Sequence, residues 1–165
     1  IEQAQIALRF PRASGEHEPF KGHLDGIVKA RDGSDGYMLE RGFTGLCVVL
    51  LSNLTDPFAG NFTVWPGSHR RLEQWFRENG HEKMNGITPR IDYPHELVQC
   101  CGRAGDVVIS HHQVVHEAAP NLSPHVRYAA IFRLRHVDVR KIGISALTDV
   151  WREWHGVRKV IEESV

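Results

Sequence analysis

Two short stretches of the 165-residue sequence carry side chains that could bind a metal ion together. The first is His23-Leu24-Asp25, and the second runs from His112 to Arg127. In an extended segment, residues i and i+2 project to the same side, so His23 and Asp25 could grip one ion. A histidine from a distant strand would complete a facial triad of two histidines and one carboxylate. This ligand set is typical of non-haem iron enzymes and leaves positions open for a co-substrate and O2.

The H-x-D motif is weak evidence by itself. With 11 histidines and 20 acidic residues, about one triplet of the H-x-D or H-x-E type is expected by chance. A second copy at His136 to Asp138 follows the last expected strand, and we interpret it as a surface feature. Candidates for the third ligand are His111, His112 and His116. The spacing leaves the choice between His112 and His116 open.

Arg127 indicates what a co-substrate could be. A dicarboxylic acid that chelates a metal through one end needs its far carboxylate neutralised. A guanidinium does this bidentately and stays charged when buried. The alternative is that Arg127 is an exposed strand residue, like Arg133 and Arg135. These two arginines share its parity in the same expected strand. Strand alternation alone does not decide which of these arginines face inward.

A scaffold of strands must position these residues. Hydrophobic runs separated by turn residues predict strands at 5–10, 44–51, 61–65, 96–101, 107–111, 114–117 and 127–135, besides an extended piece around His23. Ser68 is the expected N-cap of a helix that ends near Asn79, with Gly80 as its stop. Many short strands with few helices favour an antiparallel sandwich, barrel or jelly roll.

The length of the chain suits one domain over residues 1–165. A C-terminal helix is expected over residues 145–165, with an apolar stripe formed by Val150, Trp151, Trp154, Val157 and Ile161. The stripe is expected to pack on the core, and it leaves open a homodimer through the same helix.

The composition excludes several classes of protein. Lys+Arg and Asp+Glu both number 20, and this zero net charge argues against a nucleic-acid-binding protein. The longest apolar run, from Leu46 to Leu51, is too short to span a membrane. No signal peptide is visible, and the three cysteines lack a C-x-x-C spacing. We therefore expect a cytoplasmic protein that acts on a small molecule, with no nucleic-acid or membrane partner.

Six pieces of the sequence follow one another in a characteristic order. They are His23-Leu24-Asp25, GNFTVWPGSHR at 60–70, GDVVIS at 105–110, His116, PNLS at 120–123, and Arg127. In this order and spacing they resemble the phytanoyl-CoA dioxygenase family of Fe(II)/2-oxoglutarate-dependent oxygenases. The resemblance extends from about Gln5 to about Val137.

The resemblance implies an all-β core with flanking helices, folded as a cupin-like double-stranded β-helix (jelly roll). It implies that His23, Asp25 and His116 hold Fe(II), and that Arg127 binds the distal carboxylate of 2-oxoglutarate. His69 is similar to a structural residue of the family and is excluded as a ligand. The implied reaction uses O2 to hydroxylate a small-molecule C–H bond, with release of succinate and CO2. Because the carboxylate of Asp25 is retained, hydroxylation is favoured over halogenation.

The sequence departs from the family pattern in two places. Several relatives carry a hydroxyl group where this chain has Ala118, so Thr44 or Gln5 is expected to supply the missing donor to 2-oxoglutarate. Relatives also usually have more chain before the first strand, and we expect that region to be short or missing here. These departures keep a second hypothesis open, a non-catalytic jelly-roll module that binds a metal or small ligand. Such a module would not need a buried guanidinium at Arg127.

Overall fold

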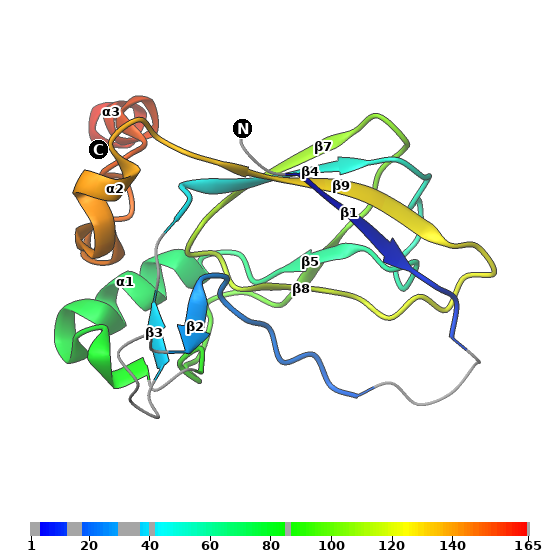
Figure 1. Cartoon of the computed structure of the whole chain (residues 1–165), viewed down its shortest axis with the longest axis horizontal. Coiled ribbons are helices and arrows are strands. Elements are labelled where there is room, and N and C mark those ends of the chain that lie inside the picture. The colour runs from blue at the N-terminus through cyan, green and yellow to red at the C-terminus, as the bar shows by residue number, and fades with distance from the viewer. Residues whose placement is uncertain (1–3, 13–17, 30–36, 40–41, 85–86, 165) are drawn as a thin grey trace.

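The computed structural model describes residues 4–12, 18–29, 37–39, 42–84 and 87–164, and in these the strands form three antiparallel sheets (Figure 1). One sheet has the order β1-β9-β4-β7, formed by Ala4–Arg9, Arg127–Leu134, Gly45–Leu50 and Val107–His111. The second has the order β6-β5-β8, formed by Val98–Cys100, Phe62–Val64 and His116–Ala118. The third pairs β2 (Ile27–Lys29) with β3 (Tyr37–Leu39).

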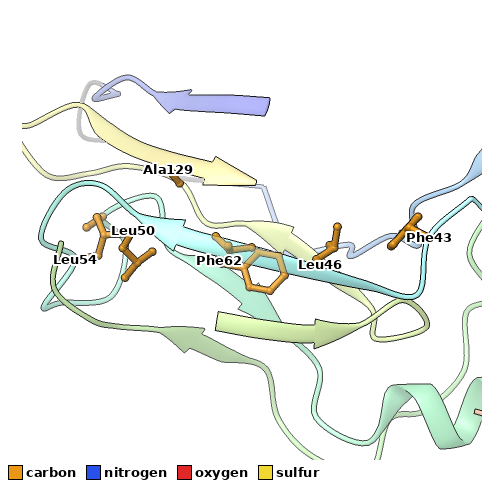
Figure 2. Packing of buried hydrophobic residues seen from close by; sticks show 8 residues of the cluster. Phe43, Leu46, Leu50, Leu54, Phe62 and Ala129 are labelled. Carbon is orange, nitrogen blue, oxygen red and sulfur yellow. The ribbon is translucent and has the colours of Figure 1, made fainter. Parts of the chain in front are cut away.

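The main hydrophobic core lies between the two larger sheets. Strand β4 contributes alternate residues, and Figure 2 shows Leu46 and Leu50 of this strand close to Phe62 of β5. The whole cluster consists of Phe43, Leu46, Val48, Leu50, Leu54, Ala59, Phe62 and Ala129. Antiparallel sheets packed face to face, with helices at one end (Figure 1), confirm the predicted all-β core with flanking helices.

All seven expected strands are present, each within two residues of its expected bounds. They correspond to β1, β4, β5, β6, β7, β8 and β9. Strands β2 and β3 have no counterpart among the predictions, because three residues each are too few to display a periodicity.

Helix α1 (Ser68–Asn79) has the predicted bounds and ends at Gly80. Its buried face carries Leu72 and Phe76, as the spacing predicts. The prediction for Ser68 is wrong, because Gly67 is the N-cap and no side chain caps the helix. The Ser68 hydroxyl instead accepts a hydrogen bond of 2.9 Å from the backbone N–H of Val115. That bond fixes the chain just before His116.

The single C-terminal helix expected over 145–165 is divided. The chain forms a short α2 (Val139–Ile142), a 3-10 helix (Gly143–Thr148), a turn, and then α3 (His155–Glu163). The break falls at Val150, whose backbone groups have distant partners. Its N–H donates to the carboxylate of Glu73, and its carbonyl lies 2.7 Å from Nε2 of His111. A residue held from both sides in this way cannot continue an α-helix. None of the described helices is both long and apolar enough to cross a membrane.

The outer face of the four-stranded sheet is apolar too. It exposes Ile6, Leu8, Tyr128, Val107 and Ile109. Ile6 on β1 is 63% exposed and Ile109 on β7 is 62% exposed. Because side chains alternate along a strand, the residues between these apolar positions of β1 face the interior of the fold instead.

Gly22 holds the segment before β2 close to the second sheet. Its φ is +61°, and a Cβ there would lie 2.5 Å from Cγ1 of Val115 and 2.7 Å from the ring of Trp65. Both the backbone conformation and the lack of space therefore require glycine at this position.

We predict that Gly22→Ala lowers the free energy of unfolding by about 2–4 kcal/mol, through backbone strain and overpacking together. Gly105→Ala is the matched control, since Gly105 also has a positive φ (+99°) but no atoms within 4 Å of the position that a Cβ would occupy. It should lose only the backbone contribution, about 1–2 kcal/mol. Urea unfolding of both variants measures the difference. Equal losses would show that the contacts around Gly22 are not tight.

Candidate active site

His23 and His116 lie opposite each other across an isolated antiparallel bridge. The N–H of His23 donates to the carbonyl of His116 at 2.9 Å, and the N–H of His116 donates back at 3.1 Å. Their rings therefore lie side by side, with centroids 4.7 Å apart. The next residue, Leu24, turns away into a second core cluster with Leu72 and Val115. Asp25 returns to the side of His23, as the alternation of an extended segment predicts.

The carboxylate of Asp25 faces both rings. Its Oδ1 lies 3.4 Å from Nε2 of His23 and 3.8 Å from Nε2 of His116. The possible ligand atoms of these three residues all lie within 4.8 Å of one another, and no other group of three or more such side chains occurs in the described residues. His111 and His112, the alternative third ligands, are not part of this group.

The ring of His116 is oriented from behind. Its Nδ1 lies 2.9 Å from the backbone carbonyl of Val114, an acceptor that favours the proton on Nδ1. Nε2 then presents a lone pair towards Asp25 and His23. Burial lowers the pKa of His116 below its usual range, which favours the neutral ring. A neutral imidazole with its second nitrogen oriented by a carbonyl is the form in which histidine binds a metal ion.

Arg133 binds the other oxygen of the same carboxylate. One of its Nη atoms lies 2.8 Å from Oδ2 of Asp25. Burial alone would raise the pKa of Asp25, but the hydrogen bond to His23 and the electrostatic interactions with His116 and Arg133 outweigh it and hold the pKa well below its usual range. The side chain of Arg133 also lies over the ring of Phe43. It is therefore not the exposed strand residue that one interpretation of the sequence allowed.

These side chains open into a cavity of about 410 Å³ between the two larger sheets, a volume suited to a small ligand. Arg127 lines the far end and is only 6% exposed. Its Nε donates to the carbonyl of Gly60 at 2.8 Å, and one Nη donates to the carbonyl of Ala7 at 3.2 Å. Burial, with a contribution from the nearby charge of Arg9, lowers the pKa of Arg127 to about 10, so it remains cationic at neutral pH.

The two expected donors to a bound acid differ in position. Gln5 of β1 lines the cavity, as does Ala118. Thr44 is not among the lining residues, and its hydroxyl accepts a hydrogen bond of 2.9 Å from the N–H of His136. Arg9, which belongs to none of the motifs in the sequence, also lines the cavity.

The remaining candidate histidines form a separate cluster near the helices. His111 lies between His112 and Trp154, and its Nδ1 accepts a hydrogen bond from the N–H of Gln113. His69 packs against His111 and Trp151, at ring distances of 5.8 Å and 5.4 Å. These rings pack the C-terminal segment onto the sheets, and we assign them a structural role.

A sequence model of one protein family matches this chain. The family is described as Phytanoyl-CoA dioxygenase (PhyH), and the match covers residues 34–129. The chain belongs to the phytanoyl-CoA dioxygenase family. His116 and Arg127 fall inside the matched range, while His23 and Asp25 precede it. The range ends within β9.

A solved structure similar to this member of the phytanoyl-CoA dioxygenase family is the non-haem α-ketoglutarate-dependent carbocyclase SnoK from nogalamycin biosynthesis. It is 21% identical, with a TM-score of 0.50 over 84% of this chain and 53% of SnoK. At this identity the likeness concerns the fold alone, and it agrees with a double-stranded β-helix core.

Two further structures are more distant. The epimerase SnoN, in complex with Fe3+, α-ketoglutarate and nogalamycin RO, is 19% identical over 78% of this chain and 46% of SnoN, with a TM-score of 0.46. HygX from Streptomyces hygroscopicus, with iron bound, is 17% identical over 78% of this chain and 55% of HygX, with a TM-score of 0.45. The chain thus spans about half the length of these proteins. No curated protein sequence matches it.

The buried ring of His69 makes stability depend on pH. Desolvation, with the charge of Arg70, lowers the pKa of His69 from 6.5 to about 4. Between these values the unfolded chain binds more protons than the folded protein, so stability is full above pH 6.5 and falls as the pH drops towards 4. We expect a loss of about 2–3 kcal/mol from this group. In urea unfolding at several pH values, His69→Gln should be less sensitive to acid than the wild type. Identical pH profiles would contradict the assignment.

Proposed function

We propose that this chain is the catalytic domain of an Fe(II)- and 2-oxoglutarate-dependent oxygenase that hydroxylates a C–H bond of a small molecule. One observation carries the proposal: His23, Asp25 and His116 converge in a cavity whose far end holds the buried Arg127. In this proposal the three side chains are the iron ligands, and Arg127 binds the distal carboxylate of 2-oxoglutarate.

The donor atoms suit the proposed ion. Two imidazole nitrogens and one carboxylate oxygen form the facial set that non-haem iron enzymes use, whereas structural zinc sites favour four ligands. The distal histidine is preset for binding, because the carbonyl of Val114 orients the ring of His116 and burial lowers its pKa. Arg133 engages Oδ2 of Asp25 and leaves Oδ1 directed at the two rings. Asp25 is therefore expected to bind through one oxygen and to leave room for a chelating co-substrate.

The rest of the cavity suits a dicarboxylic oxo acid. When bound, Fe(II) supplies the activation of O2 and the oxidative decarboxylation of the oxo acid, chemistry that no side chain provides. Arg127 orients the acid by its far carboxylate, with a fixed fork of donors. Between Arg127 and the proposed ligands the wall is apolar, formed by Leu46, Val48, Phe62, Ala129 and Ile131. This wall is expected to limit the water around a bound acid and so to strengthen the charge interactions along its chain.

Two finer parts of the proposal rest on particular residues. Hydroxylation is favoured over halogenation because Asp25 occupies the position that a halide would need. A cytoplasmic location is favoured because Cys47, Cys100 and Cys101 are free thiols. The reaction expected is consumption of O2 and 2-oxoglutarate with formation of an alcohol, succinate and CO2.

A second candidate function is supported by the ion pair between Asp25 and Arg133. Because Arg133 already neutralises the carboxylate, the same cavity could bind a small acid in a non-catalytic module. Such a module would bind acids with or without iron, and it would form no succinate.

Anaerobic titration with Fe(II) and then 2-oxoglutarate tests the proposal. We expect a visible charge-transfer band on addition of 2-oxoglutarate, because a chelated oxo acid accepts charge from the ion. Asp25→Ala should weaken Fe(II) binding by at least about 100-fold, since the loss of even an outer partner of a ligand costs 10–100-fold. Calorimetric titration measures the affinity.

Asp138→Ala is the matched control, because it removes the carboxylate of the other H-x-D motif, which is exposed and lies outside the cavity. It should bind Fe(II) as the wild type does. If Asp25→Ala retained wild-type affinity, the ligand assignment would be wrong. If the wild-type protein bound Fe(II) and 2-oxoglutarate without a band, the binding module would be the better description.

A further inference from the structure

Arg9 stands directly opposite Arg127 in the antiparallel pair of β1 and β9. Directly opposed residues of such a pair project to the same face, here the face that lines the cavity. Gly60 lies close to both stems: a Cβ there would lie 3.0 Å from Cβ of Arg9 and 3.2 Å from Cβ of Arg127. Two guanidinium groups therefore share one end of the cavity.

Neither arginine is neutralised by a carboxylate of the described residues. Arg127 donates to the carbonyls of Gly60 and Ala7, and an Nη of Arg9 lies 3.4 Å from the carbonyl of Ala118. Within the part of the chain that the structure describes, no carboxylate lies within ion-pairing distance of either guanidinium. Like charges directly opposite in a sheet are destabilising, and a buried charge without a counter-ion costs more. An arrangement of this kind is suited to binding an anion.

The backbone of Arg9 is held firmly although its side chain is exposed. Its carbonyl accepts a hydrogen bond of 2.8 Å from the side-chain amide of Asn121, a residue of the PNLS turn. The carbonyl of Asn121 in turn accepts from the N–H of Arg12 at 2.8 Å. Asn121 is fully buried and fixes this end of β1 against the turn. The Arg9 guanidinium thus starts from a fixed point and reaches towards Ala118.

We propose that Arg9 and Arg127 form a two-guanidinium clamp, in which Arg9 supplies the second donor to the distal carboxylate of the co-substrate. The inference rests on the proposed function. It assigns to Arg9, rather than to Thr44 or Gln5, the hydrogen bond that a hydroxyl group at the position of Ala118 would donate. The clamp selects 2-oxo acids that carry a second carboxylate. A 2-oxo acid of the same length with a methyl end gains nothing from it.

The test compares 2-oxoglutarate with 2-oxovalerate, which has the same chain length but no distal carboxylate. Dissociation constants are measured from the charge-transfer band of the anaerobic Fe(II) protein. Arg9→Met should weaken 2-oxoglutarate binding roughly tenfold, as expected for one charge-assisted hydrogen bond, and leave 2-oxovalerate binding unchanged. Arg9→Lys should recover part of the loss. Arg103→Met, an exposed arginine outside the cavity, is the control and should behave as the wild type.

Thermal unfolding distinguishes a clamp from a merely structural residue. Removing one of two opposed charges should raise the melting temperature of the ligand-free Arg9→Met protein, whereas loss of a structural contact would lower it. Unchanged 2-oxoglutarate affinity in Arg9→Met, or equal weakening of both oxo acids, would overturn the proposal.

Failure of the proposed function would be seen separately, as absence of the band in the wild-type protein. The clamp would then be tested without metal, with glutarate as the probe. Glutarate should raise the melting temperature of the wild type and of Arg103→Met more than that of Arg9→Met. Equal shifts in all three proteins would overturn the clamp.

Discussion

The structure of the site depends on the register of strand β9. This strand is hydrogen-bonded to β1 on one side and to β4 on the other, so neither of its edges is free to shift. Its residues of odd number, from Arg127 to Arg133, form one row along the cavity. A slip by one residue would turn the whole row to the outer face. A single register therefore sets both ends of the cavity: the end with two opposed arginines and the end where Arg133 engages Asp25.

Charge is distributed unevenly along this cavity. At one end the charge of Arg133 is balanced by Asp25. The carboxylate of Glu117 accepts hydrogen bonds from the backbone N–H groups of Lys21 and Gly22. At the other end the positive charge of Arg9 and Arg127 has no counterpart among the described residues. An elongated acid entering the cavity would therefore be oriented by the protein's field before any metal contact forms. The apolar wall between the ends adds to this effect, because apolar side chains screen charges less than water does.

The elements with strong local signals were predictable from the sequence, and those determined by distant contacts were not. The apolar run of β4 is by itself sufficient to predict a buried strand, and Gly80 is by itself sufficient to predict the end of helix α1. Arg9 was missed because Ile6, Leu8 and Phe10 form the apolar set of β1, which normally faces a core, yet here they face outward. Arg133 could not be placed by parity, since Arg127 and Arg135 share it. Nor could local pattern reveal the break in the C-terminal helix, because its cause is the pair of distant partners of Val150.

The bridge between His23 and His116 joins parts of the chain that lie about ninety residues apart. An ion held by both rings would act as a reversible cross-link across that long loop. By the chain-entropy reasoning used for covalent cross-links, closing a loop of this size is worth up to about 4–5 kcal/mol. Occupancy of the ion site and resistance to proteolysis would then rise and fall together, because mass action favours the folded form that binds the ion. A shortage of the ion that these residues are proposed to bind would then shorten the lifetime of the folded protein.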